Sequence, residues 1–275
     1  MDWVQTIADR TGLQHLPGVM LHGGHEGLIR IARGMCPEVR RYNPIKGARM
    51  SGIRIISSMA TRQVLADLVA RWRGPSQVDV ESVGGVEAAR RVEAGEAFDA
   101  VVLAANAIDK LIEAGRLVAG SRVDLVRSGV YVAVRTGAAH PDLGSEQAVR
   151  VAVLAARTVG YSTGPSGVAL EKQFAQWGIA DQVEAKLVQA PPGVPVGSLV
   201  ARGEVELGFQ QLSELMNLPG IDVVGPLPPA IQVITTFSAG VTPGAADADQ
   251  ARALLRFMAS AEVADVKRAN GMEPA

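Results

Sequence analysis

Two segments of this chain share one order of features: a short apolar run, a turn rich in hydroxyl groups, and then a helical pattern. The first segment covers residues 53–60, and its helical pattern starts at Thr61. The second covers residues 157–167, and its helical pattern starts at Val168. The start of a helix presents unpaired N–H groups and a partial positive charge, so each turn predicts an anion site. Two such turns predict a cleft that closes on a small anion from both sides.

The composition favours two modest α/β lobes. The chain has 275 residues, of which 48% are hydrophobic but only 4% aromatic, so its cores must consist of small and medium aliphatic side chains. Such side chains suit parallel sheets covered by alanine-rich helices. The formal net charge of −1 argues against general binding of nucleic acid or of a membrane surface, which requires clustered basic groups.

The single cysteine, Cys36, excludes an internal disulfide, and we expect an inert thiol because no helix start or basic partner is evident beside it. No run of ~18 apolar residues is present, so no transmembrane helix is expected. The first residues lack the basic start and apolar stretch of a secretory signal. We therefore expect a cytoplasmic protein as written, or a periplasmic one if the sequence is that of a processed or mis-started form.

Residues 1–49 differ from the rest of the chain and are interpreted as an N-terminal extension of uncertain order, with Met50 as a second possible start. His22 and His25 resemble a fragment of a metal site, but two ligands are too few for a tight one. No dinucleotide fingerprint, phosphate-binding loop with lysine or nucleophile elbow is present. The sequence thus predicts neither a metal nor a cofactor.

From residue 52 onward, strand and helix patterns alternate. Strands are expected at 53–56, 78–83, 97–104, 123–135, 186–189, 205–209 and 231–241. Helices are expected at 61–72, 86–96, 106–114, 145–155, 166–177, 196–201, 247–258 and 261–269. Asn106 is the expected N-cap of its helix.

This alternation predicts an α/β fold of two lobes, each with a mainly parallel sheet flanked by helices and with a hinged cleft between them. The long stretches 123–135 and 225–241 are candidates for the two crossings between lobes. Lobe I is then discontinuous, 50–130 plus 224–275, and lobe II is 131–223. Ligands in such sheets bind beyond the carboxyl ends of the strands, where both hydroxyl turns lie.

Several short pieces, in this order along the chain, resemble one known family. They are residues 57–59, 86–95, 98–103, 164–167 and 206–209, followed by the closing 269–274. Together they are similar to the type II periplasmic-binding-protein fold, specifically its molybdate-binding-protein-like branch of substrate-binding proteins, a family that also includes aconitate isomerase. The resemblance implies an anion held by hydroxyls and backbone N–H groups at the mouths of the loops.

Carried over by position, the resemblance implies a set of ligand-binding residues drawn from five loops. They are Ser57, Ser58, Met59, Gly84, Gly85, Ser162, Thr163, Gly164, Pro165, Ser166, Gly167, Pro195, Val196, Gln210 and Gln211. Two positions depart from the molybdate binders: Gly84-Gly85 replaces the usual serine, and Gln210-Gln211 replaces the usual tyrosine. Glutamine side chains both donate and accept hydrogen bonds, so they suit a carboxylate or polar organic anion better than a bare oxyanion.

Three functions remain open. The first is a non-catalytic binding protein for a small oxyanion or carboxylate, serving an ABC-type transporter if it is exported. The second is a cofactor-independent isomerase that moves an allylic proton on a di- or tricarboxylate, as aconitate isomerase does, and the third is a cytoplasmic ligand sensor. For the isomerase, the positional candidates for catalysis are Ser58, Arg62, Glu171 and Lys172.

Each of these residues also has an ordinary structural interpretation. The serines at 57, 58 and 166 can serve as helix caps or as an N-terminal turn. Gln210-Gln211 can be the first turn of a surface helix. Arg62, Glu171 and Lys172 can be solvated side chains on exposed helix faces.

Overall fold

The computed structural model describes residues 52–275, which belong to one compact unit, Arg49–Ala275. The predictions for Cys36, for His22 and His25, and for the N-terminal extension lie outside the described residues. In the described part of the chain, no helix is long and apolar enough to cross a bilayer.

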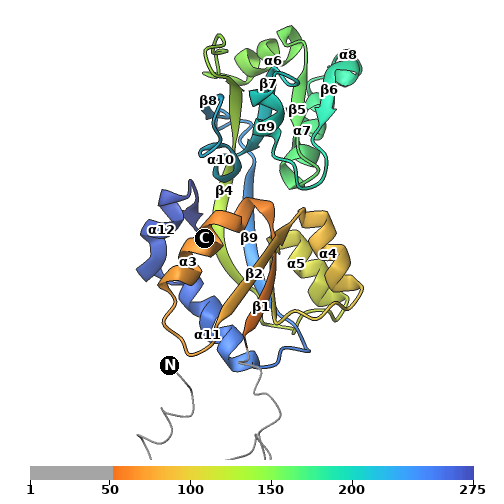
Figure 1. Ribbon diagram of the computed structural model, residues 1–275. Coiled ribbons are helices and arrows are strands. Elements are labelled where there is room, and N and C mark those ends of the chain that lie inside the picture. Colours follow the sequence, from red (N-terminus) through yellow and green to blue (C-terminus); the bar gives the residue numbers. More distant parts are fainter. Residues whose placement is uncertain (1–51) are drawn as a thin grey trace, which may run out of the picture. The chain divides into compact units, whose positions relative to one another are not determined.

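The first sheet has the strand order β2-β1-β3-β9-β4, and the short β10 also pairs with β4 (Figure 1). Its strands are β1 (Ile53–Ser58), β2 (Val78–Val83), β3 (Ala100–Ala104), β4 (Val123–Arg135), β9 (Ile234–Val241) and β10 (Glu273–Pro274). The first three strands run parallel, whereas β9 is antiparallel to both β3 and β4. The carboxyl ends of β1 and β2 therefore meet at one edge, where ligands bind in open α/β sheets.

The second sheet continues from the other half of β4, in the order β4-β7-β5-β6, with β8 also paired to β4. Its further strands are β5 (Val159–Tyr161), β6 (Leu187–Gln189), β7 (Leu207–Gln211) and β8 (Ile221–Pro226). Strands β5, β6 and β7 are parallel to one another, and β7 is antiparallel to β4. Each sheet thus combines a parallel set of three strands with antiparallel crossing strands.

Helices cover the faces of both sheets. They are η1 (Met59–Thr61), α3 (Arg62–Arg71), α4 (Gly85–Glu93), α5 (Ala105–Glu113), α6 (Glu146–Ala155), α7 (Pro165–Gln176), α8 (Ala180–Val183), η2 (Glu184–Lys186), α9 (Val196–Ala201), α10 (Leu212–Leu215), α11 (Ala248–Ala259), η3 (Ala261–Val263) and α12 (Ala264–Ala269). On the first sheet, α3, α11 and α12 share one hydrophobic core, and α4 and α5 share another. Strand β3 lies between these cores and is buried throughout, as expected for a continuous apolar strand.

Strand β4 connects the two sheets. Its first half, through Gly129, pairs with β9, and its second half, from Val130, pairs with β7 and β8. We call the part built on the first sheet lobe I and the part built on the second sheet lobe II. The residue boundaries predicted for the lobes stay a prediction.

The observed elements differ from the sequence-based expectations in several details. Helix α5 begins at Ala105, and its N-cap is Ala104, so Asn106 lies inside the helix and does not cap it. Gln210 and Gln211 are the buried last residues of β7, not the first turn of a surface helix. Strand β8 was not predicted, because all but one of its side chains are half-buried and the strand therefore has no clear alternation of buried and exposed positions.

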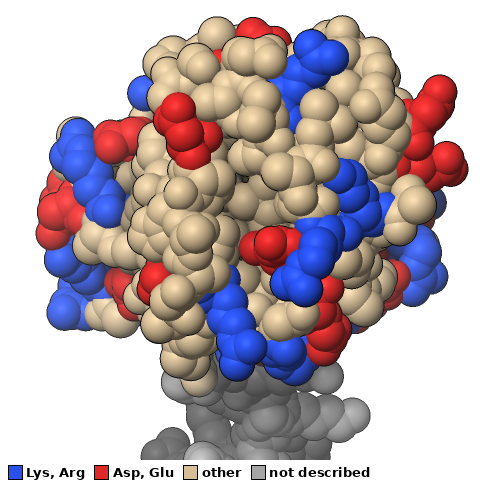
Figure 2. Space-filling view, turned by 90° about the horizontal axis from the view of Figure 1, so that it is seen from above, with Lys and Arg blue, Asp and Glu red and all other residues tan. Residues whose placement is uncertain are grey.

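The face of the molecule seen from above carries interspersed charges. Figure 2 shows acidic and basic side chains interspersed on this face, with uncharged surface between the charged groups. This mixed pattern agrees with the near-zero net charge of the sequence.

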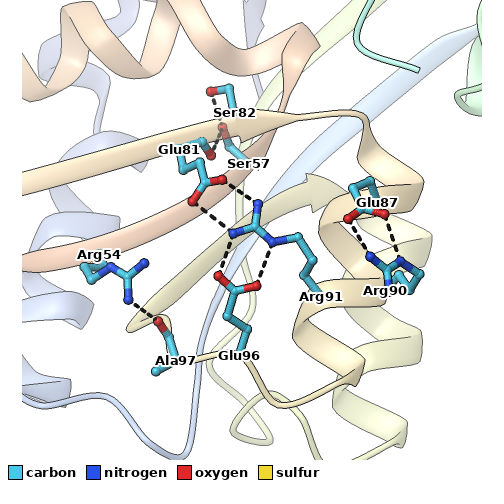
Figure 3. A network of polar contacts seen from close by, with 9 residues as sticks. All are labelled: Arg54, Ser57, Glu81, Ser82, Glu87, Arg90, Arg91, Glu96 and Ala97. Carbon is cyan, nitrogen blue, oxygen red and sulfur yellow. Dashed lines mark hydrogen bonds and ion pairs between the residues drawn. The ribbon is translucent and has the colours of Figure 1, made fainter. Parts of the chain in front are cut away.

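A network of ion pairs holds the last turn of α4 (Figure 3). Arg91 donates to Glu81 of β2 at 2.5 Å and to Glu96 at 2.6 Å, and its guanidinium lies over the ring of Phe98. Arg54 lies over the same ring at 5.1 Å from its centroid. The network therefore joins β1, β2, α4 and the turn after α4 around one aromatic side chain.

Replacing Arg91 by methionine is expected to lower the melting temperature at neutral pH but not in acid. Hydrogen bonds from Arg91 hold the pKa values of Glu81 and Glu96 below the ordinary value of 4.5. A carboxyl whose pKa is lowered in the folded state stabilises the protein above its unfolded pKa, and this contribution is lost as the pH falls through the folded pKa. Melting curves of Arg91→Met and the native protein should differ at about pH 7 and approach each other in acid, as the pH falls through the lowered pKa values of the two carboxyls; a difference independent of pH would contradict this account.

Candidate functional site

One pocket lies between the two lobes, at the carboxyl ends of their parallel strands. Its wall comes from the loops after β1, β2, β5, β6 and β7, with Phe237 of β9 beside them. The lining residues are Ser58, Met59, Ala60, Gly84, Gly85, Ser162, Thr163, Gly164, Pro165, Ala190, Pro191, Gly193, Val194, Pro195, Gln210, Gln211, Glu214 and Phe237. Loops that are far apart in the sequence thus form one site.

Two helices from opposite lobes begin at this pocket. Gly85 is the first residue of α4 and Pro165 is the first residue of α7, and neither helix has a side-chain cap. By contrast, Ser145 and Asp247 cap α6 and α11 with their side chains. The free N–H groups and the dipoles of α4 and α7 therefore favour a negative charge in the pocket.

Most of the predicted ligand-binding residues line the pocket. They are Ser58, Met59, Gly84, Gly85, Ser162, Thr163, Gly164, Pro165, Pro195, Gln210 and Gln211. The other four predicted residues, Ser57, Ser166, Gly167 and Val196, are buried but do not line it. That any of them contacts a ligand stays a prediction.

Two of these buried serines have protein partners. The hydroxyl of Ser57 lies 2.8 Å from the hydroxyl of Ser82. The neighbouring Ser58, which lines the pocket, occupies the N-cap position of η1 but makes no cap hydrogen bond. Ser166 lies 3.2 Å from the hydroxyl of Ser162 and donates to Gln211 at 3.3 Å. A series of side-chain hydrogen bonds thus connects the loop after β5 with the end of β7.

Three of the positional candidates for catalysis lie outside the pocket lining. Arg62, Glu171 and Lys172 are all exposed. Glu171 instead influences Tyr161, whose pKa is raised to about 12, mainly by burial and secondarily by this nearby carboxylate. Of the four candidates, only Ser58 reaches the pocket.

The loop 190–195 is a stiff wall of the pocket. The N–H of Val194 donates to the carbonyl of Pro191, which closes a turn around Pro192 and Gly193. Gly193 has φ +79°, the left-handed value that the third position of a type II turn requires. Proline before this glycine fixes the turn, so the loop presents its backbone to the pocket in one conformation.

The lobes also contact each other beside the pocket. Ser213 of α10 donates to the carbonyl of Ala60 at 2.9 Å. A Cβ atom on Gly84 would lie 3.8 Å from the backbone nitrogen of Gly193, which is ordinary van der Waals distance. The pocket is therefore partly closed in this structure.

Sequence reasoning missed the one ionisable side chain among the described residues that line the pocket, Glu214. It lies on α10, four residues after Gln210. Burial raises its pKa to about 7, and the nearby side-chain amide of Gln210 partly opposes the rise. A carboxylate one turn beyond the end of a predicted strand is the signal that could have identified it.

Comparison with known proteins places this architecture in one family. A family model of bacterial extracellular solute-binding proteins matches residues 53–273, so the chain belongs to this family. The molybdate-binding protein of Azotobacter vinelandii has the same fold, with a TM-score of 0.66 and 20% identity over 80% of this chain and 98% of that one. The sulfate-binding protein SubI of Mycobacterium tuberculosis also has a TM-score of 0.66, with 13% identity over 82% of this chain and 87% of that one.

These matches confirm the predicted fold class and the predicted molybdate-binding-protein-like family. A further relative is more similar in sequence: an aconitate isomerase of Pseudomonas sp is 39% identical over 185 residues, which cover 67% of this chain and 70% of the relative. The chain is thus a solute-binding-family protein that resembles an enzyme as well as binding proteins.

Proposed function

We propose that this protein binds a tricarboxylate in the pocket between its lobes and isomerises it by moving an allylic proton, with aconitate as the substrate. The observation that carries the proposal is the convergence of two uncapped helix starts, α4 and α7, on a pocket that also holds two buried glutamine amides. Helix starts and hydroxyls bind carboxylates, and amides both donate to and accept from a polar organic anion. The sequence similarity to an aconitate isomerase supports the choice of substrate.

The proposed reaction needs few groups. Aconitate carries three carboxylates on a skeleton in which a double bond stands next to a methylene carbon. Moving one proton from that methylene to the far end of the double bond shifts the bond without an oxidant, a reductant or water. The site must bind the carboxylates, hold the carbon skeleton still and provide a group that accepts and returns the proton.

A second candidate function is a receptor that binds a small oxyanion without converting it and delivers it to an ABC-type transporter. The fold shared with molybdate- and sulfate-binding proteins favours it. A cytoplasmic ligand sensor is a weaker form of the same proposal, in which closure of the lobes signals binding. In both cases the bound ligand leaves unchanged.

A thermal-shift panel separates these functions. The full chain is heated with cis-aconitate, trans-aconitate, tricarballylate, molybdate, tungstate or sulfate, and each stabilising ligand is then checked for conversion. A ligand at 100 times its Kd stabilises the folded state by about 2.7 kcal/mol. We expect the tricarboxylates to raise the melting temperature and aconitate to be converted; stabilisation by molybdate or tungstate alone would favour the receptor.

A further inference from the structure

Glu214 occupies a distinctive place in the pocket. Its helix, α10, packs against β4, β7, α9 and η1. Neither β7, α9 nor η1 carries an ionisable side chain, and the charged residues of β4, Asp124, Arg127 and Arg135, do not line the pocket. In the described chain, this carboxyl therefore faces the pocket without a charged partner.

The orientation of Glu214 is set by a neighbour whose own orientation is fixed. The backbone N–H of Val196, at the start of α9, donates to the side-chain oxygen of Gln210 at 2.7 Å. Because a backbone N–H can only donate, the oxygen of the Gln210 amide must face Val196, and its NH₂ group is left for Glu214. Gln210 is 2% exposed, so this arrangement is held inside the protein.

We propose that Glu214 is the proton-transfer group of this site and that Gln210 is its positioning residue. The proposal rests on the proposed function. The carboxylate of Glu214 takes a proton from the methylene carbon of bound aconitate, and the electron pair of that C–H bond forms the new double bond. The electron pair of the old double bond then takes the proton back from Glu214, so that the carbon at the other end of the allylic system becomes the new methylene. One carboxyl performs both steps, and no co-reactant is consumed.

The electrostatics of the site agree with this role. A proton-transfer group works best when its pKa is near the working pH, and that of Glu214 is raised to about 7 by burial. The pocket serines have no comparable group beside them to remove their protons. Arg62, Glu171 and Lys172 lie outside the pocket lining.

The test compares Glu214→Gln with Glu113→Gln, a matched change of an exposed glutamate on α5 outside the pocket. General acid–base catalysis contributes about 100-fold or more, so we expect Glu214→Gln to lose at least about 100-fold in kcat and Glu113→Gln to keep its activity. Glu214→Gln should fold, because it removes a half-buried acid whose raised pKa costs stability above about pH 5. Should it melt early, Glu214→Asp, which keeps the carboxyl, should restore part of the turnover.

A second readout does not depend on turnover. Tricarballylate is a saturated tricarboxylate that can bind but cannot be converted. Between pH 6 and pH 8, its affinity for the native protein should fall about tenfold more than its affinity for Glu214→Gln, because the ionised carboxylate of Glu214 repels it. In the native protein, the Gln210 amide holds the pKa of Glu214 down. Gln210→Met removes this amide, so it should raise that pKa and shift the pH profile of turnover to higher pH. A merely structural Gln210 would leave this profile unmoved.

The outcomes separate the two proposals. If the native protein converts aconitate and Glu214→Gln does so within tenfold, Glu214 is not the proton-transfer group while the proposed function stands. If the native protein converts neither isomer, the proposed function and the proton step both fail. In that case, equal pH dependence of tricarballylate binding in the native protein and Glu214→Gln would also remove Glu214 from the ligand site.

Discussion

Gly167→Ala is expected to destabilise the protein by about 3 kcal/mol and to abolish ligand-induced stabilisation. A Cβ atom at this position would lie 1.8 Å from the carbonyl oxygen of Ser162 and 3.0 Å from the ring of Tyr161. The carbonyl belongs to the backbone, so the side chain cannot simply rotate away. Either the turn after β5 or the start of α7 must move, and both contribute to the pocket wall.

The direction of this effect is informative because helix propensity predicts the opposite. Alanine inside a helix is usually about 1 kcal/mol more favourable than glycine. A suitable control is Gly244→Ala, since Gly244 has no atom within 4 Å of its Cβ position; it should change stability by less than about 0.5 kcal/mol. Urea unfolding of both variants measures the difference, and a Gly167→Ala protein as stable as the native one would show that α7 does not hold the turn this tightly.

The double variant Ser58→Ala/Ser162→Ala is expected to bind tricarboxylates at least about a hundredfold more weakly. The two serines line the pocket from opposite lobes, Ser58 after β1 and Ser162 after β5. A hydrogen bond to a charged group contributes about 1.5–3 kcal/mol, and two bonds on separate elements should add. Neither hydroxyl caps a helix, so the fold should survive their loss.

Calorimetric titration with tricarballylate measures this loss, with Ser82→Ala as the control. Ser82 lies close by, 2.8 Å from the hydroxyl of Ser57, but does not line the pocket. We expect Ser82→Ala to bind within about threefold of the native protein, as for a change away from the ligand. Unchanged binding by the double variant would mean that the anion is held elsewhere or by backbone groups alone.

The elements of lobes I and II were largely predictable because their signals are local. The buried run of β3 and the long β4 follow directly from apolar patterns, and β4 matches its predicted range, 123–135. The hydroxyl turns after β1 and β5 were visible because serine and glycine stand between a strand and a helix pattern. Parallel strands then bring the ends of such turns to the same edge, so the meeting of the two hydroxyl turns followed from topology. The glycines, proline and glutamines of the pocket lining were instead carried over from the family resemblance.

The unpredicted features depend on contacts between distant residues. Glu214 lies in a stretch for which the sequence predicts no element, and only the packing of α10 between the lobes makes it a pocket carboxyl. Ser166 and Gly167 stand beside pocket residues in the chain, but the tight turn onto α7 places them behind the wall. Periodicity reports which face of a helix is buried but not what lies opposite that face.

The most direct test of the account is an NMR measurement of the full chain with aconitate, started separately from the pure cis and the pure trans isomer. A catalyst changes the rate and not the equilibrium, so both samples should converge on the same ratio of isomers, and samples without protein should change far more slowly. Glu214→Gln should leave both samples close to their starting composition. If aconitate binds to the native protein and neither sample changes, the protein is a receptor for its ligand and the proposed isomerase activity is wrong.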